Sequence, residues 1–178
     1  MGVALTTCTV PGAPTSNRLD GDLIELGMGI HGEPGRTQLP MPNNKMAADS
    51  VVQSMLEQIL ERCYNGSKRG SSSSLSSSVA VLINNLGATP SIELYIIARS
   101  VLLQLKAIGI NVARVYVGHY MTALEMAGVS VSLLDLDKYP ELTEYLDEPT
   151  QAPAWVPSHN LSERGKYTVC IYVLRIYV

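Results

Sequence analysis

The apolar run Val79–Ile83 (VAVLI) constrains the fold more than any other part of this chain. Five consecutive apolar residues with no polar residue among them are typical of a strand that is buried on both faces. Asn84 and Asn85 end the run, and a helical pattern follows that Gly109 terminates. Strands that alternate with helices at such intervals predict an α/β domain, in which helices are layered on a sheet.

The rest of the chain fits the same alternation. Apolar runs predict further strands over residues 2–8, 23–31, 111–117 and 129–136, and residues 32–42 are expected to form a loop. Helical spacing of apolar residues predicts helices near residues 44–63, 90–108 and 138–146, with a short helical turn over residues 120–126. Asn43 or Asn44 is expected to cap the first helix, and Thr89 the second. Hairpin pairing of the first two strands would make the sheet mixed.

Two segments depart from this order. Residues 65–78 read NGSKRGSSSSLSSS, and this low-complexity composition predicts a flexible surface insertion over residues 66–78, poorly ordered over Ser71–Ser78. Residues 157–178 do not continue the alternation, although Tyr167–Val178 is an apolar, β-prone run with a single charge. This tail is either a strand or an unrelated end with a tendency to aggregate. We therefore expect one domain over residues 1–156, followed by a divergent tail.

His31 has the most distinctive surroundings of the three histidines. It lies within Gly27–Gly35 (GMGIHGEPG), where four glycines surround it at the end of a predicted strand. Glycine removes side-chain bulk and permits positive φ, so the backbone can turn sharply there and another molecule can come close. A neutral imidazole in such a place can act as a nucleophile, a proton carrier or a metal ligand. We expect His31 to lie partly accessible at the mouth of a concave surface; the alternative is a structural histidine in a tight turn.

The same stretch satisfies the dinucleotide-binding fingerprint through Gly27, Gly29 and Gly32. In a dinucleotide site the last glycine opens a helix whose N-terminus holds the pyrophosphate. Prolines at positions 34, 40 and 42 follow here, and no helix can run through them. A dinucleotide site is therefore not expected.

Charge, hydropathy and cysteine content exclude several partners and locations. The formal net charge is −3 and no basic stripe follows any predicted helix, so nucleic acid is not expected as a partner. No apolar run is long enough to span a bilayer and none has the form of a signal peptide, so no membrane association is expected. The three cysteines have neither zinc-site nor disulfide spacing, which is typical of a reducing compartment, and we expect a cytoplasmic location.

Several motifs, in the same order along residues 1–156, resemble the second lobe of the dihydroxyacetone (glycerone) kinase substrate-binding subunit. They are Gly2–Leu5 with Cys8 and Pro11-Gly12, Glu25–Gly35, Asn84–Pro90 with Glu93-Leu94-Tyr95, Gly118, Leu124-Glu125-Met126 with Gly128, and Ala152–Trp155. The GIHGEPG and NNLG motifs together are specific to that family. The resemblance implies a mixed sheet layered with helices.

In that family, the histidine that matches His31 binds the substrate covalently. Its ring nitrogen adds to the ketone carbon of dihydroxyacetone to form a hemiaminal, and a phosphoryl group then passes to a hydroxyl of the bound triose. A ring nitrogen that has added has no second proton to lose, so the reaction stops at the carbinol and no Schiff base forms. The resemblance implies His31 as the catalytic residue, and His31, Gly32 and Glu33 as residues that bind dihydroxyacetone or a similar short ketose or aldose; no metal ligand is expected.

The resemblance also indicates what this chain lacks. The family's first lobe completes the sugar pocket with a Gly-Ser-Gly-His loop and an acidic residue, and nothing here matches them. ATP and Mg²⁺ belong to a separate helical domain or partner, or a phosphotransfer protein supplies the phosphate, so no cofactor is expected on this chain. Pairing of the family's subunits through this lobe predicts a homo-oligomer. We expect the chain alone to be inactive as a kinase; the alternative is a non-catalytic, sugar-sensing or regulatory paralogue that acts as an interaction module.

Other polar residues near these motifs have structural interpretations. Glu33 orients the His31 ring or the loop, or is only a loop carboxylate before a proline. The amides of Asn84 and Asn85 are expected to tie the strand-to-helix turn rather than to line a ligand cleft. His119 is interpreted as structural or solvated, and Cys8 as a small buried hydrophobe.

Overall fold

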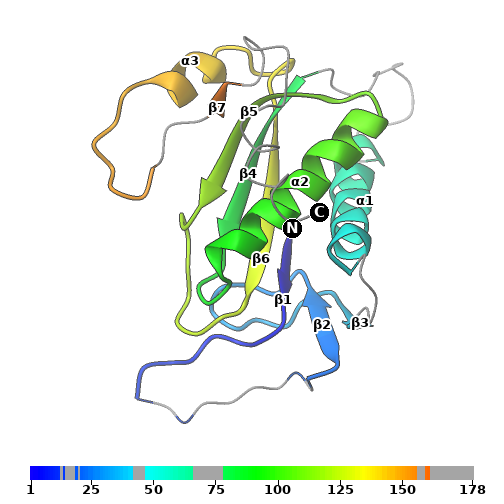
Figure 1. The fold of residues 1–178 in the computed structure, drawn as a ribbon, viewed down its shortest axis with the longest axis vertical. Coiled ribbons are helices and arrows are strands. Elements are labelled where there is room, and N and C mark those ends of the chain that lie inside the picture. Colours follow the sequence, from blue (N-terminus) through cyan, green and yellow to red (C-terminus); the bar gives the residue numbers. More distant parts are fainter. Residues whose placement is uncertain are drawn as a thin grey trace.

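A computed structural model describes residues 1–12, 14, 19, 21–41, 47–65, 78–155 and 159–160. The fold is built on one mixed sheet. Seven strands lie in the order β3-β2-β1-β6-β4-β5-β7 (Figure 1). They are β1 (Gly2–Ala4), β2 (Leu23–Leu26), β3 (Thr37–Pro40), β4 (Ser78–Asn85), β5 (Asn111–Gly118), β6 (Gly128–Asp135) and β7 (His159–Asn160). The helices are α1 (Ala47–Asn65), α2 (Ser91–Ala107) and α3 (Leu142–Asp147).

The strand directions make the sheet mixed, as the sequence predicts. β4 and β5 are parallel, and α2 connects them. All other neighbouring strands in the described sheet are antiparallel, including the predicted pair β1 and β2. The parallel pair requires a crossover helix, whereas the antiparallel pairs can be joined by turns.

β4 is buried on both faces, which confirms the interpretation of its apolar run. Val79, Val81 and Ile83 belong to the main core, together with residues of α1 and α2. Ala80 points to the opposite face and packs in a second cluster with Leu136. The two long helices lie together on one face (Figure 1), and Leu146 of α3 packs against the cluster on the other, so the sheet is layered with helices on both sides.

The first predicted strands are longer than the real ones, and one strand was missed. β1 ends at Ala4. β2 ends at Leu26, because Gly27 has a φ of 83° and turns the chain out of the strand. The predicted loop over residues 32–42 contains β3, which pairs with β2. β3 contains Pro40 and lies at the edge of the sheet, where a missing backbone N–H is tolerated.

The start of α2 and the β5–β6 connection also differ from expectation. Pro90, not Thr89, is the N-cap residue of α2. The Thr89 hydroxyl instead donates to the Gly128 carbonyl at 2.7 Å and accepts from the Gly128 N–H at 2.8 Å. Residues 120–126 form no helical turn, and the third helix begins at Leu142 rather than near residue 138. The other two predicted helices and the stop at Gly109, where φ is 82°, are confirmed.

Some expectations concern residues outside the described part of the chain. These are the cap at Asn43 or Asn44, the insertion over residues 66–77 and most of the tail. Ser78, which we assigned to the insertion, is the first residue of β4. In the tail, His159–Asn160 pairs with β5 as β7. Across the described ranges, no helix combines the length and the apolarity needed to cross a bilayer.

A bidentate ion pair attaches α3 to the sheet. Arg114 of β5 is buried, and its Nε and Nη2 donate to the two carboxylate oxygens of Asp147 at 2.7 and 2.6 Å. These hydrogen bonds from the Arg114 guanidinium hold the pKa of Asp147 below its usual value of 3.8. The Tyr116 hydroxyl adds a hydrogen bond to the Leu146 carbonyl at 3.0 Å. Removal of Asp147 would leave the buried guanidinium without its carboxylate.

We expect Asp147→Asn to lower the free energy of unfolding by about 1–3 kcal/mol at neutral pH. Because the pKa of Asp147 is lower in the folded state, its contribution is complete above pH 3.8 and is lost as the pH falls through the folded-state value. Urea unfolding at pH 7 and at pH 3 measures this, with the exposed Glu144→Gln on the same helix as control. Equal stability of wild type and Asp147→Asn at pH 7 would contradict the role of the ion pair.

Candidate active site

The glycine-rich stretch forms the loop of a β-hairpin. β2 and β3 pair with Leu26 opposite Thr37, so residues 27–36 close the hairpin and His31 lies near the middle of the loop. No helix follows Gly32 in the described residues 33–41, which lead instead into β3. The fingerprint therefore lacks the helix that a dinucleotide site needs, as expected.

Hydrogen bonds fix both ends of this loop. The Gly27 N–H donates to the Gly2 carbonyl of β1 at 2.7 Å, and the Arg36 N–H donates to the Leu26 carbonyl at 2.7 Å. The Gly35 N–H also donates to the buried carboxylate of Glu25 on β2. Hydrogen bonds to β1 and β2 thus hold the two ends of the loop in place.

Apolar contacts hold the loop from below. Met28 is buried and Ile30 is partly buried in a cluster with Ala4 and Met126. The Sγ of Cys8 lies 3.2 Å from the point where a Cβ on Gly32 would stand, so Cys8 supports the loop and is half-buried rather than fully buried. Because Met28 and Ile30 point into the protein, the side chain of His31, which follows Ile30, points outward.

The His31 ring faces solvent, with 81% of its side chain exposed. Glu33 makes two contacts with His31. Its Oε2 accepts a hydrogen bond from the His31 backbone N–H at 3.1 Å, and its Oε1 lies 3.2 Å from Nδ1 of the ring. A hydrogen bond from the Glu33 backbone N–H, and then those from His31, lower the pKa of Glu33 below its usual value of 4.5. The carboxylate is therefore ionised at neutral pH and accepts a hydrogen bond from Nδ1–H, which leaves the lone pair on Nε2.

Two glycines make this arrangement possible. A Cβ on Gly29 would overlap the Glu33 carboxylate, so only glycine lets Glu33 fold back toward His31. Gly32 has a φ of 83°, a conformation that strains other residues, and its N–H donates to the Gly29 carbonyl at 3.1 Å. His31, Gly32 and Glu33, which the sequence singled out, are consecutive in this loop, and Glu33 folds back onto His31.

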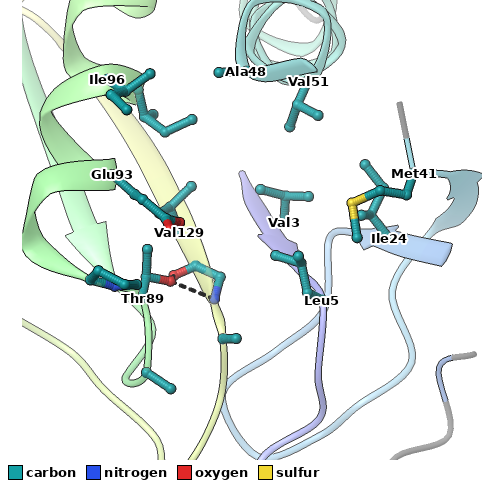
Figure 2. A pocket seen from close by; sticks show the side chains of 15 residues that line it. Val3, Leu5, Ile24, Met41, Ala48, Val51, Thr89, Glu93, Ile96 and Val129 are labelled. Atoms are coloured by element: carbon teal, nitrogen blue, oxygen red, sulfur yellow. Dashed lines mark hydrogen bonds between the residues drawn. The ribbon is translucent and has the colours of Figure 1, made fainter. Parts of the chain in front are cut away.

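A large cavity lies elsewhere, between α1, α2 and β1 (Figure 2). Its volume is about 580 Å³, and its walls are mostly apolar, with Leu5, Val51 and Ile96 among them and Glu93 as the charged residue. His31 does not line this cavity. Its walls suit contact with apolar groups better than recognition of a sugar, so we do not assign it to the substrate.

The two asparagines that end β4 are structural, but only Asn85 ties the strand-to-helix turn as expected. Asn84 Oδ1 accepts from the backbone N–H groups of Tyr120 and Met121 at 2.8 and 2.9 Å, which holds residues 120–126 in an open connection. Asn85 is fully buried, and its Oδ1 accepts from the N–H groups of Gly87 and Thr89 at 2.7 and 3.2 Å. The Asn85 amide thus ties the turn between β4 and α2, whereas the Asn84 amide holds the connection between β5 and β6.

Asn85 also explains the position of His119. With Oδ1 committed to two backbone donors, Asn85 presents its Nδ2 to the Thr89 carbonyl at 2.6 Å and to His119 Nε2 at 2.9 Å. Nε2 of His119 must therefore accept, so its proton is on Nδ1. This agrees with the interpretation of His119 as structural.

Sequence reasoning missed several residues that position the site. Glu25 is the one acidic residue of β2 and reaches the loop at Gly35; its place in an otherwise apolar strand was the available signal. Thr6 and Thr9 were also missed, and their hydroxyls donate to the Glu125 carbonyl and carboxylate at 3.0 and 2.6 Å. Nothing in the sequence marks these long-range pairs. Among the described residues, no three His, Cys, Asp or Glu side chains gather as metal ligands.

Comparison with known proteins decides the family. A model of the Dak1 domain matches residues 1–154. The chain belongs to the Dak1 family. This confirms the resemblance on which the sequence analysis relied, since the motifs that carried it lie, except for Trp155, within the matched residues.

Three similar proteins show how much of a Dak1 protein the chain represents. It is 46% identical over 159 residues to the putative 3,4-dihydroxy-2-butanone kinase of Solanum lycopersicum, covering 87% of this chain and 25% of that protein. It is 41% identical over 158 residues to the dihydroxyacetone-binding subunit DhaK of the PTS-dependent dihydroxyacetone kinase 1 of Listeria innocua, covering 87% and 44%. The solved structure of the dihydroxyacetone kinase operon co-activator Dha-DhaQ superposes with a TM-score of 0.74 at 31% identity, covering 89% and 45%. The chain thus spans less than half the length of each.

Proposed function

We propose that this chain is the lobe of a dihydroxyacetone kinase that holds the substrate, and that His31 binds dihydroxyacetone or a similar short ketose or aldose covalently. The observation that carries the proposal is the exposed His31 ring whose Nδ1 faces the Glu33 carboxylate at 3.2 Å. That contact leaves Nε2 as a free nucleophile on the outer side of the loop. Two findings support the choice of substrate: the chain belongs to the Dak1 family, and it is similar to a dihydroxyacetone-binding subunit.

The reaction at His31 is an addition that needs no leaving group. The Nε2 lone pair forms a bond to the ketone carbon, and the π electrons of the carbonyl move to its oxygen. The oxygen takes up a proton from water, while the ring loses its Nδ1 proton through the hydrogen bond to Glu33 and on to water. The product is a neutral hemiaminal, and atoms, charge and electrons balance. Because a carbonyl is required, the site selects ketoses and aldoses over glycerol.

Each of the three site residues has a separate part in this step. His31 supplies the nucleophile. Glu33 holds the ring and stabilises the positive charge that develops on it as Nε2 adds, as a carboxylate beside a histidine does in other enzymes. Gly32 contributes space, since its N–H is already bound to the Gly29 carbonyl and it has no side chain to block the ring.

The rest of a kinase would come from other parts of the protein or from partners. A first lobe would close the sugar pocket over His31, which accounts for the high exposure of the ring here. ATP and Mg²⁺ would belong to a separate helical domain, or a phosphotransfer protein would donate the phosphate. The short share of the relatives' length that the chain spans supports this division. We also propose a cytoplasmic homo-oligomer.

A regulatory paralogue is the second candidate, since a co-activator of a dihydroxyacetone kinase operon is among the similar structures. In that case the lobe would bind the sugar, or a protein, without phosphoryl transfer. The genomic sequence upstream of the codon for Met1 separates the two. An open frame that encodes the Gly-Ser-Gly-His lobe supports the kinase.

We expect the purified chain to gain the mass of one dihydroxyacetone when it is incubated with the ketone and analysed intact without borohydride. His31→Ala should abolish the adduct. Glu33→Gln should raise the dihydroxyacetone concentration for half-labelling by about 3–10-fold, because a neutral acceptor forms a weaker hydrogen bond than a carboxylate. Glu148→Gln, an exposed carboxylate outside the loop, is the matched control and should label normally. An adduct that persists in His31→Ala would exclude the proposed nucleophile.

We expect no phosphorylation of dihydroxyacetone by the chain alone with ATP and Mg²⁺. Phosphoryl transfer needs a nucleotide site and a base near the accepting hydroxyl, which the proposal places outside this chain. A coupled assay for dihydroxyacetone phosphate measures turnover, and a complete dihydroxyacetone kinase serves as the positive control. Turnover by the purified chain that His31→Ala abolishes would show that the division between lobes is wrong.

A further inference from the structure

A second, smaller cavity lies at the base of the hairpin that carries His31. Its volume is about 380 Å³, and it is lined by Met1, Gly2, Gly27, Arg36, Ile59 and Arg62. Ile59 and Arg62 are three residues apart on α1, so they lie on the same face of that helix. The cavity therefore joins the end of α1, the start of β1 and the two ends of the site loop.

The charge of this cavity has one sign. Arg36 and Arg62 line it, and no acidic residue does. Within the described part of the chain, neither guanidinium has a carboxylate partner, although the chain as a whole carries a net charge of −3.

Each arginine alone has an ordinary explanation. Arg62 lies in the last turn of α1, where a cation complements the helix dipole. Arg36 precedes the edge strand β3, where charged side chains discourage pairing with other chains. Neither explanation accounts for the two guanidiniums lining the same cavity, where like charges repel unless an anion lies between them.

We propose that this cavity is a binding site for a phosphate group, either free or as a phosphate monoester, held between the guanidiniums of Arg36 and Arg62. Guanidinium presents paired N–H donors in a plane that matches two phosphate oxygens, and two such groups suit a dianion. Ile59 forms an apolar wall of the cavity. Two cations are too few for a nucleic-acid backbone.

The position of the site links the anion to the His31 loop. Gly27 and Arg36 are the first and last residues of that loop, and both line the cavity. A phosphate bound there would draw Arg36 toward Arg62 and hold the end of the loop against α1. The site stands on its own residues and does not depend on whether His31 forms an adduct.

The test is an NMR titration of the ¹⁵N-labelled, 178-residue chain at low ionic strength. The probes are inorganic phosphate and glycerol 3-phosphate; the second has no carbonyl, so His31 cannot add to it. We expect saturable shifts of the Arg36 and Arg62 Nε–H resonances with one or both probes. If both bind, the phosphate group alone is recognised, and if only glycerol 3-phosphate binds, the site requires an ester.

Variants identify the cations that bind. Arg36→Gln and Arg62→Gln should each weaken binding by about tenfold, the loss expected for one charge-assisted interaction. Arg99→Gln removes an exposed arginine of α2 that does not line the cavity, and it should bind as wild type does. Arg62→Lys should retain part of the affinity, because it keeps the charge but loses the paired donors.

Three results would overturn the proposal. They are shifts that do not saturate, shifts that chloride reproduces at the same ionic strength, and equal losses in Arg99→Gln and in the cavity variants. The Nε–H resonances of the wild-type chain decide the question even if a variant fails to fold, and circular dichroism identifies such a variant. Retained adduct formation by Arg36→Gln separates this site from the site at His31.

Discussion

β1 is the link through which the hairpin that carries His31 is attached to the rest of the sheet. On one side it pairs with β2 through Val3 and Ala4, and on the other it pairs with β6 over Gly2–Ala4. β2 and β3 reach the central strands through β1 in the strand order. A strand of three residues thus determines where the site loop stands.

The surroundings of β1 show how closely it is held. A Cβ on Gly128 would come within 2.8 Å of the Ala4 Cα and would overlap the Val3 carbonyl oxygen, so only glycine allows β6 to approach β1 here. Gly128 is in turn fixed by the Thr89 hydroxyl, which binds both its N–H and its carbonyl. The start of α2 is therefore connected through β6 and β1 to the loop of His31. A Thr89 that we expected to cap a helix serves this connection instead.

The sequence predicted those parts of the fold that depend on local patterns. The double-sided burial of β4, the two long helices and the stop at Gly109 follow from periodicity and backbone preference. Local patterns could not predict β3, whose polar, proline-containing sequence is stable as a strand only because β2 provides a partner. The end of β2 at Leu26 was equally hidden, since Met28 and Ile30 continue its apolar alternation but pack under a loop.

The sequence named candidate site residues but not their geometry. His31, Gly32 and Glu33 were chosen from the motif, and the structure adds the contact between Glu33 and Nδ1 and the space that Gly29 leaves for it. We expected His31 to lie partly accessible at the mouth of a concave surface, but its ring is largely exposed in this structure. The proposed nucleophile is thus positioned within one hairpin, whereas a closed pocket would require other residues to cover it.

The proton on the His31 ring tests this account most directly. Free histidine favours the tautomer with its proton on Nε2, whereas the contact with Glu33 predicts the proton on Nδ1 and an unprotonated Nε2. Long-range ¹H–¹⁵N NMR of the neutral ring distinguishes the two nitrogens by their chemical shifts. The account predicts the Nδ1–H tautomer in the wild-type chain and a shift toward Nε2–H in Glu33→Gln. A wild-type ring with its proton on Nε2, unchanged in Glu33→Gln, would contradict it.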